Sequence, residues 1–164
     1  MLKIYPVKTK EDVENARKLF CEYAGFLKKE LYEYKDSPWL VEYYKDFEKE
    51  VENLPKRYEQ PKGCILVGMY NEQPIGCVAL AEQSENICEM KRLYVKPEYR
   101  RKGFGTALCE AVMEQAKKAG YTHMRLGTAL EPPKVLYKSL GFKEIAPYEE
   151  VPVEGVVFME LKLV

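Results

Sequence analysis

The stretch from Ile87 to Thr106, ICEMKRLYVKPEYRRKGFGT, constrains the fold of this chain more than any other. The run from Cys88 to Val95 is strand-like, the basic glycine turn Arg100-Arg101-Lys102-Gly103-Phe104-Gly105 comes soon after it, and an amphipathic helix follows at once. The first backbone N–H groups of a helix have no intrahelical partner, and the helix dipole favours an anion there. This order of strand, basic turn and helix is therefore a way to hold a phosphate.

The charges of the turn sharpen that interpretation. Arg100, Arg101 and Lys102 lie where the dipole prefers acids, which costs about 0.3–1 kcal/mol for each charge. A ligand phosphate would reverse the sign of this interaction. Gly103 and Gly105 have no side chains, so a ligand can approach the backbone closely. The alternative is a solvated basic turn with ordinary helix-start glycines.

Composition places the chain in a broad class. Its 164 residues suit one domain spanning 1–164, and 26 bases balance 26 acids, which argues against general attraction to nucleic acids or membrane surfaces. Five scattered cysteines and the single His123 form no zinc-binding pattern, so we expect no metal and a reducing compartment. With neither a signal peptide nor a long apolar run, the chain is predicted to be cytoplasmic and not inserted in a membrane.

Periodicity predicts an α/β order of elements. Helices are expected over about 10–28, from Pro38 to before Pro55, over about 104–119, and after Pro132-Pro133. Strands are expected at 2–7, 64–70, 74–81, 87–95, 121–128, 142–145 and 156–163, with a hairpin turn at Asn71-Glu72-Gln73.

The central strand changes phase along its length. Cys88 and Met90 lie on one face, yet strict alternation puts Leu93 and Val95 on the other. A slip between Lys91 and Arg92 would restore one apolar face. The pattern therefore predicts a bulge or bend, a device that re-aims side chains near active sites.

The segment 30–52 is both acidic and aromatic, with eight acids against three lysines and several tyrosines. The plainer interpretation is a solvated helix face with buried tyrosine rings. The alternative is an acidic, aromatic-walled entrance that attracts a cationic substrate.

With these motifs in place, the chain resembles the GNAT superfamily of acetyl-CoA-dependent N-acetyltransferases. The turn at 100–105 fits the family's Arg/Gln-x-x-Gly-x-Gly/Ala signature, and Leu136-Tyr137 with Gly141-Phe142 matches a later family element. The resemblance covers 64–145; residues 10–60 share only the presence of two helices. It implies a twisted mixed, mostly antiparallel sheet flanked by helices, in which the strands at 87–95 and 121–128 splay apart around the cofactor.

The resemblance also implies how acetyl-CoA would be held. Backbone amides from Arg101 to Thr106 would bind the pyrophosphate, and backbone groups of Leu93 and Val95 would pair with the pantetheine arm. An N–H near Leu93 or Tyr94 would bind the oxyanion. The resemblance thus assigns Leu93, Tyr94, Val95, Arg100, Arg101, Lys102, Gly103, Phe104, Gly105 and Thr106 to the cofactor site. Core packing is the competing account of Leu93 and Val95.

Two residues are candidates for proton transfer. An alkylamine with a pKa near ~10.4 is protonated at neutral pH, so a base must accept its proton. Glu89 lies at the position of the glutamate base in some family members, although it could be an exposed charge, with a water chain to another carboxylate serving instead. Tyr137 lies at the family's position for the donor to the departing thiolate; the alternative is a packing role.

The resemblance implies an enzyme that moves acetyl directly from acetyl-CoA to a primary amine of a small molecule or protein, without a covalent enzyme intermediate. The alternative is a non-catalytic acyl-CoA-binding sensor or scaffold. Many members have Asn-x-x-Ala where this chain has Leu130-Glu131-Pro132-Pro133, so that pantetheine contact does not carry over. Cys109 is expected to be inert and His123 to be a packed or rim residue; a homodimer is left open.

Overall fold

The computed structural model describes residues 1–164, which form a seven-stranded sheet flanked by helices. The strands are β1 (Leu2–Pro6), β2 (Cys64–Tyr70), β3 (Gln73–Ser84), β4 (Ile87–Val95), β5 (His123–Thr128), β6 (Lys143–Ile145) and β7 (Val157–Lys162). The α-helices are α1 (Lys10–Glu30), α2 (Pro38–Glu52), α3 (Phe104–Lys118) and α4 (Glu131–Ser139). Short 3-10 helices are η1 (Tyr32–Tyr34), η2 (Lys56–Tyr58) and η3 (Pro97–Tyr99).

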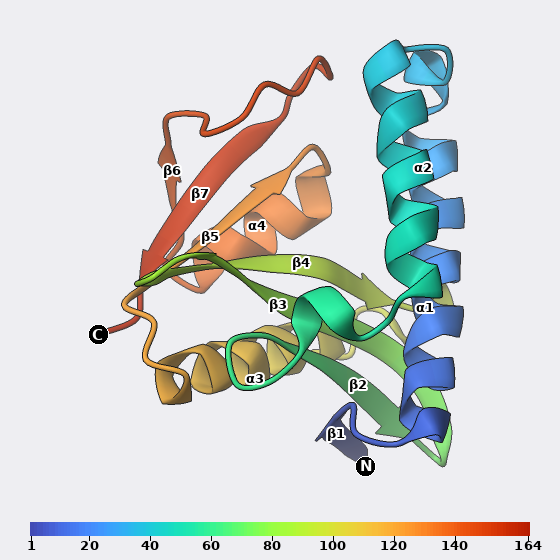
Figure 1. Ribbon diagram of the computed structural model, residues 1–164, viewed down its shortest axis with the longest axis vertical. Coiled ribbons are helices and arrows are strands. Elements are labelled where there is room, and N and C mark those ends of the chain that lie inside the picture. The colour runs from blue at the N-terminus through green and yellow to red at the C-terminus, as the bar shows by residue number, and fades with distance from the viewer.

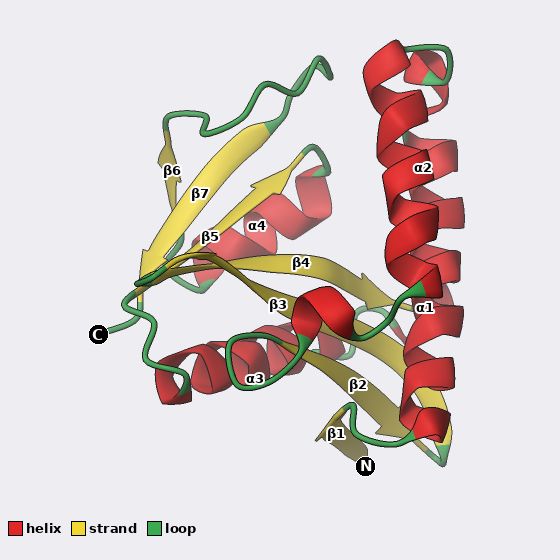
Figure 2. Ribbon diagram, viewed as in Figure 1, coloured by secondary structure: helices red, strands yellow, loops and turns green.

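The sheet has the order β1-β2-β3-β4-β5-β7-β6 and is antiparallel except between β4 and β5. Helices α1 and α2 cover one face, and α3 and α4 cover the other (Figures 1 and 2). Each face has its own core, one centred on Leu108 and Val112 of α3 and the other on Leu19 and Phe20 of α1. The predicted mixed, mostly antiparallel sheet is confirmed.

Local chemistry sets several of these boundaries. Thr9 begins α1 with a capping box, in which its hydroxyl accepts from the Asp12 amide and the Asp12 carboxylate accepts from the Thr9 amide. Pro38 occupies the first turn of α2, where its missing N–H costs nothing. The β2–β3 hairpin turns at Asn71 and Glu72, which both have positive φ, so the predicted hairpin is confirmed.

Tertiary contacts move some of the predicted ends. Strand β3 continues past Ala81 to Ser84 because it still pairs with β4 there, Ser84 facing Ile87. Strand β5 begins at His123 rather than at Tyr121, whose side chain is buried and donates to the Lys62 carbonyl at 2.6 Å.

The phase change in β4 is a bulge, as predicted. In the pairing of β3 with β4, Cys77 faces Tyr94 while Ala79 faces Lys91, so β4 has one extra residue. Arg92 has a φ of +62°, a left-handed conformation that is uncommon for a residue other than glycine. Cys88, Met90, Leu93 and Val95 consequently all pack on the α3 side of the sheet, while the Arg92 and Tyr94 side chains face α1 and α2.

None of the helices combines the length with the apolar character that a membrane-crossing segment requires.

Candidate active site

Strands β4 and β5 run parallel but separate soon after they meet. Only Ile87, Cys88 and Glu89 pair with β5, opposite His123, Met124 and Arg125. Beyond this point β4 continues along β3, while β5 follows β7, and Figure 1 shows the two halves of the sheet diverging. The β4 edge from Met90 to Val95 therefore has no strand on its β5 side. The predicted splay is confirmed.

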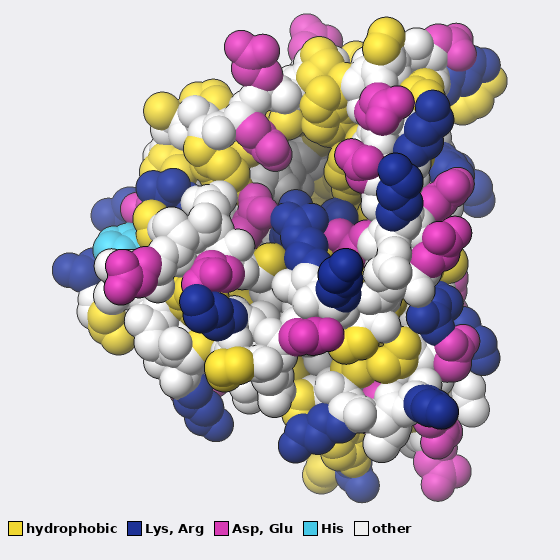
Figure 3. Space-filling model, viewed as in Figure 1, with side chains coloured by type: hydrophobic (Ala, Val, Ile, Leu, Met, Phe, Trp, Pro, Cys, Tyr) yellow, Lys and Arg dark blue, Asp and Glu magenta, His cyan; other side chains and the backbone are white.

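A cavity with about 160 Å³ of room for solvent lies at this splay. Its walls come from α1 and α2, from β4 and β5, from the start of α4, and from the loop between β6 and β7. Figure 3 shows the hollow between α2 and the β5–β7 half of the molecule, with basic side chains at its base. The polar lining residues are Tyr23, Trp39, Tyr43, Glu89, Lys91, Arg92, Thr128, Tyr137 and Glu149.

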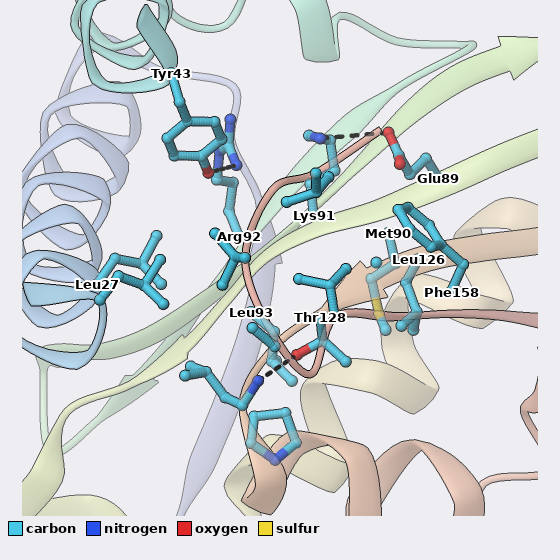
Figure 4. A pocket seen from close by; sticks show the side chains of 18 of the residues that line it. Leu27, Tyr43, Glu89, Met90, Lys91, Arg92, Leu93, Leu126, Thr128 and Phe158 are labelled. Atoms are coloured by element: carbon cyan, nitrogen blue, oxygen red, sulfur yellow. Dashed lines mark hydrogen bonds and ion pairs between the residues drawn. The ribbon is translucent and has the colours of Figure 1, made fainter. Parts of the chain in front are cut away.

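Arg92 is placed at the cavity floor by the bulge. Its Nε and Nη2 donate to the two carboxylate oxygens of Glu50 at 2.9 and 3.1 Å. Its Nη1 donates to the Tyr43 hydroxyl at 2.9 Å (Figure 4). The guanidinium also lies 4.6 Å from the ring centroid of Phe47. Burial opposes the charge of Glu50, but hydrogen bonds and charge from Arg92 more than offset it, and the pKa of Glu50 is lowered. This buried pair joins α2 to β4.

Glu89 lines the same cavity, with only 12% of its side chain exposed. Its Oε2 accepts a 2.7 Å hydrogen bond from the Tyr148 hydroxyl. Its Oε1 lies 3.3 Å from Lys91 Nζ (Figure 4). Arg57 approaches the same carboxylate at 3.9 Å. The solvated, unpaired charge that was the alternative interpretation of Glu89 is therefore not what the structure has.

Lys91 is the immediate cationic neighbour of Glu89 in the cavity lining. Burial lowers its pKa, and the positive charges of Arg92 and Arg57 lower it further, while Glu89 acts in the opposite direction. Lys91 and Glu89 stand two positions apart on β4 and point to the same side, as the period of a strand requires. Together they form a charged pair in an otherwise mostly apolar cavity.

Tyr137 reaches the cavity from the last turn of α4 and is 7% exposed. Its ring packs on Phe142 with centroids 5.8 Å apart, and its hydroxyl has no hydrogen-bond partner within the chain. Burial raises the pKa of Tyr137 well above its ordinary value, and the neighbouring Cys109 and Tyr23 act in the same direction. The phenol is therefore protonated at neutral pH. The structure thus brings Glu89 and Tyr137, predicted from separate motifs, to one cavity.

The basic glycine turn lies at the start of α3, outside this cavity lining. Arg101 and Gly103 have positive φ values of 62° and 81°, which turn the backbone sharply into the helix. No side chain caps α3, and its first intrahelical bond runs from the Ala107 amide to the Gly103 carbonyl. The amides of Arg101, Lys102 and Gly103 likewise donate no hydrogen bond within the chain. The turn therefore presents unpartnered amides, as an anion site requires.

Two of the predicted cofactor residues turn their side chains away from the β4–β5 splay. Arg100 donates from Nε to the Val95 carbonyl at 2.8 Å, and its guanidinium lies 4.8 Å from the Phe26 ring. The Tyr94 side chain is buried with the α1 core. Leu93, by contrast, lines the cavity, and Val95 packs beside Leu136 of α4. Arg100 and Tyr94 can therefore contribute only backbone groups to a ligand in the splay.

The acidic segment 30–52 does not form an entrance to the cavity. None of its eight acids lines the cavity, and seven of them are exposed; the exception is Glu50, which is paired with Arg92. The cavity takes only Trp39, Leu40 and Tyr43 from α2. This arrangement matches the plainer interpretation, a solvated helix face with aromatic rings on its inner side.

The segment that lacks the family asparagine leads directly into α4. Thr128, at the end of β5, accepts a 3.3 Å hydrogen bond from the Leu130 amide (Figure 4). Pro132 and Pro133 then occupy the first turn of the helix. The turn is thus closed by Thr128 rather than by a side chain from the Leu130–Pro133 segment.

Neither Cys109 nor His123 belongs to the cavity. Cys109 is fully buried, and burial raises the pKa of its thiol to about 12, so it remains a thiol at neutral pH. His123 begins β5, where its Nδ1 lies 2.8 Å from the Thr122 hydroxyl.

The sequence did not identify three residues at this site: Lys91, Arg92 and Tyr148. The phase slip at Lys91–Arg92 was the available signal for the first two, because a bulge turns both side chains toward the same face. Tyr148 had no such signal. It lies in a loop, and its partner Glu89 is 59 positions away.

Comparisons with known proteins agree with this geometry. Residues 24–142 match the profile of the acetyltransferase (GNAT) family. An uncharacterized N-acetyltransferase of Schizosaccharomyces pombe is 37% identical over 124 residues, covering 73% of this chain and 76% of its own. One from Methanocaldococcus jannaschii is 31% identical over 155 residues, covering 88% of this chain and 63% of its own length.

The fold agrees with solved structures as well. The PaiA N-acetyltransferase of Thermoplasma acidophilum, crystallised in complex with coenzyme A, superposes with a TM-score of 0.73 at 26% identity and covers 99% of both chains. A profile match over most of the chain, with the splayed strands and the glycine turn in their expected places, leads to one conclusion. The chain belongs to the GNAT family of acetyltransferases.

Proposed function

We propose that this protein transfers an acetyl group from acetyl-CoA directly to a primary amine of a small molecule or protein. The observation that carries the proposal is the convergence of Glu89 and Tyr137 on one cavity at the β4–β5 splay. One residue can accept a proton and the other can donate one, and direct acyl transfer to an amine needs both.

The chain's own groups fit coenzyme A. The amides at the start of α3 have no acceptor within the protein, so they suit a diphosphate. The β4 edge from Met90 to Val95 offers backbone groups to an amide-containing arm, as in the addition of a strand. The coenzyme A found with the Thermoplasma relative supports the same ligand here. Acetyl-CoA would supply an acetyl group activated as a thioester.

Glu89 and Tyr137 would carry out the two proton transfers of the reaction. The attacking amine must lose a proton, and Glu89 is the carboxylate in the cavity lining that is placed to receive it. As the new C–N bond forms and the C–S bond breaks, the leaving sulfur takes up a proton from Tyr137, whose raised pKa keeps the phenol protonated. A backbone N–H of Leu93 or Tyr94, close to the bulge, would donate to the carbonyl oxygen.

A non-catalytic acyl-CoA sensor is the second candidate, favoured by one observation. Both oxygens of Glu89 are already engaged, by Tyr148 and by Lys91. A carboxylate that keeps these partners would be slow to accept a proton. The sensor would bind acetyl-CoA but release no thiol in response to an amine.

Thiol release from acetyl-CoA, measured across polyamines, aminoglycosides, amino acids and peptides, separates the two. The enzyme releases thiol in proportion to amine, and Glu89→Gln and Tyr137→Phe each lower that rate while still binding acetyl-CoA. Tight binding of acetyl-CoA with no amine-dependent release across the panel would refute the transferase and leave the sensor.

A further inference from the structure

The charged groups at the cavity floor are paired, but Lys91 shares its only carboxylate partner. Arg92 pairs with Glu50, while Lys91 and Arg57 both approach Glu89, at 3.3 and 3.9 Å. Arg57 is half exposed, so solvent screens its charge, whereas only 19% of the Lys91 side chain is exposed. The charge of Lys91 is therefore weakly screened and favours an additional anion beside it.

Lys91 is the cation in the cavity lining that has unused hydrogen-bond donors. Arg92 uses all three of its nitrogens on Glu50 and Tyr43, and Arg57 is directed toward Glu50 and Glu89 from outside the cavity lining. The Lys91 ammonium has three donors and spends one, at 3.3 Å, on Glu89. Lys91 also lines the cavity directly.

No acid other than Glu89 pairs with Lys91. Glu149 lines the cavity from the β6–β7 loop, but it is an exposed rim residue without an ion pair to any cation. The remaining acids of α2 are exposed and lie outside the lining. A bound anion can therefore take up the two donors of Lys91 that Glu89 leaves free.

We infer that the acceptor is a small amino acid, whose carboxylate binds Lys91 while its amine faces Glu89. The inference rests on the proposed acetyl transfer and names the class of amine. It assigns Lys91 as a specificity-determining residue. The carboxylate of the amino acid would take the two Lys91 donors that Glu89 leaves free, and the amine proton would pass to the Glu89 carboxylate.

The spacing of the two charges suits this ligand. Glu89 Oε1 and Lys91 Nζ are 3.3 Å apart. In an α-amino acid the nitrogen and the carboxylate carbon are joined through one atom by two bonds of about 1.5 Å. Both charges can therefore be matched at once, each with its opposite. Apolar residues line the same cavity, including Leu40, Leu126 and Phe158, and leave an apolar surface for the amino-acid side chain.

The roof of the cavity argues for a small acceptor rather than a protein. The loop between β6 and β7 is fixed on two sides, because the Glu154 amide donates to the Tyr34 hydroxyl at 3.1 Å and Lys134 Nζ donates to the Gly155 carbonyl at 2.6 Å. Lys134 is 8% exposed, so this second anchor is buried. A folded polypeptide would have to displace this loop, whereas a free amino acid would not.

The test compares each genetically encoded L-amino acid with its α-carboxamide as acceptor, using acetyl-CoA and thiol release. The amide keeps the amine and removes the negative charge. Its amine is less basic and so intrinsically readier to react at neutral pH, which means that a preference for the acid must come from the protein. For the best acceptor we expect kcat/KM of the acid to exceed that of the amide by about tenfold or more.

Variants of Lys91 identify the source of the preference. Lys91→Met should raise KM for the acid and lower its kcat/KM, relative to that of the amide in the same variant, about tenfold or more, so that the preference disappears. Lys91→Arg should retain it. Lys62→Met is the matched control, because Lys62 pairs with Glu82 at 3.1 Å on the surface and does not line the cavity. Acetyl-CoA affinity and melting temperature report whether each variant is folded.

Three results would overturn the inference. Amides or simple amines acetylated as well as free amino acids would reject the amino acid as acceptor while leaving acetyl transfer intact. An equal loss of kcat/KM for the acid and the amide in Lys91→Met would show that the lysine does not bind the carboxylate of the acceptor. No thiol release with any amine would remove the proposed transfer itself, together with this inference.

Discussion

Tyr148 donates a 2.7 Å hydrogen bond to Oε2 of Glu89, joining the β6–β7 loop to the splayed strand β4. The Tyr148 ring packs edge-on against Phe158 with centroids 4.6 Å apart, and Arg125 lies 5.7 Å from the ring on another side. The phenol is thus held in place by its own neighbours. Tyr148 is therefore placed to orient the carboxylate that we propose as the base.

Replacing Tyr148 by Phe should lower the rate of acetyl transfer. The variant keeps the ring contacts but removes the hydroxyl that orients the Glu89 carboxylate. At pH 7 we expect kcat/KM to fall by about 10- to 150-fold, as for the loss of one hydrogen bond to a charged group. Tyr5→Phe, on the exposed edge strand β1, is the control. A kcat/KM equal to that of the wild type would show that Tyr148 does not position the base.

Tyr137→Phe should separate proton donation from binding. Loss of the phenol proton should lower kcat by about 100-fold or more, while acetyl-CoA affinity measured by calorimetry stays within about twofold. Because the pKa of Tyr137 is raised above its ordinary value of 10.0, the wild-type rate should not fall through its ionisation below that pH. Unchanged turnover in the variant would assign Tyr137 to packing against Phe142.

Gly103→Glu should abolish tight binding of acetyl-CoA. The substitution adds bulk and a negative charge at the start of α3, beside the unpartnered amides, and we expect affinity to fall by about 100-fold or more. Gly120→Glu is a close match. Both glycines have positive φ, 81° and 93°, and neither would bring a new Cβ within 4 Å of another group. Equal affinity in the two variants would mean that the turn is not the diphosphate site.

Glu50→Gln should destabilise the fold. It leaves Arg92 buried without its charged partner, which costs about 3–5 kcal/mol in the free energy of unfolding. Glu42→Gln, in an exposed pair with Lys45 at 3.5 Å, should cost less than about 1 kcal/mol. Denaturant unfolding measures both. A cost for Glu50→Gln no larger than that for Glu42→Gln would show that the buried pair contributes nothing.

The same pair predicts a pH dependence of stability. The pKa of Glu50 in the folded protein lies below its ordinary value of 4.5. The contribution of the ionised Glu50 to the free energy of unfolding is therefore complete above pH 4.5. It is lost as the pH falls through the lower pKa that Glu50 has in the folded protein. The wild type should lose stability in this acidic range more steeply than Glu50→Gln. Parallel curves for the two proteins would contradict this linkage.

Local patterns in the sequence predicted the features that depend on local geometry. The glycine turn, the Asn71–Glu72 hairpin and the bulge at Arg92 each follow from residues that are close together in the chain. Contacts between distant segments could not be predicted in this way. The pairing of Arg92 with Glu50 spans 42 positions, and that of Tyr148 with Glu89 spans 59. Both depend on how α2 and the β6–β7 loop pack against β4. The hydrophobic periodicity of the sequence does not indicate that packing.

The same limit applies to the cavity that we propose for the acceptor. The acids of 30–52 are conspicuous in the sequence, yet all but one are on the outer surface, and the charges that line the cavity come mainly from β4. Net charge along a segment says nothing about which side chains turn inward. The docking of α1 and α2 against the sheet decides it.

A crystal structure of the protein soaked with acetyl-CoA tests the central claim most directly. It should show the diphosphate on the backbone amides of Arg101 to Thr106, the pantetheine arm along the open edge of β4, and the acetyl group in the cavity between Leu93 and Tyr137. A cofactor bound elsewhere, or a turn whose amides stay without the diphosphate at saturating acetyl-CoA, would contradict it.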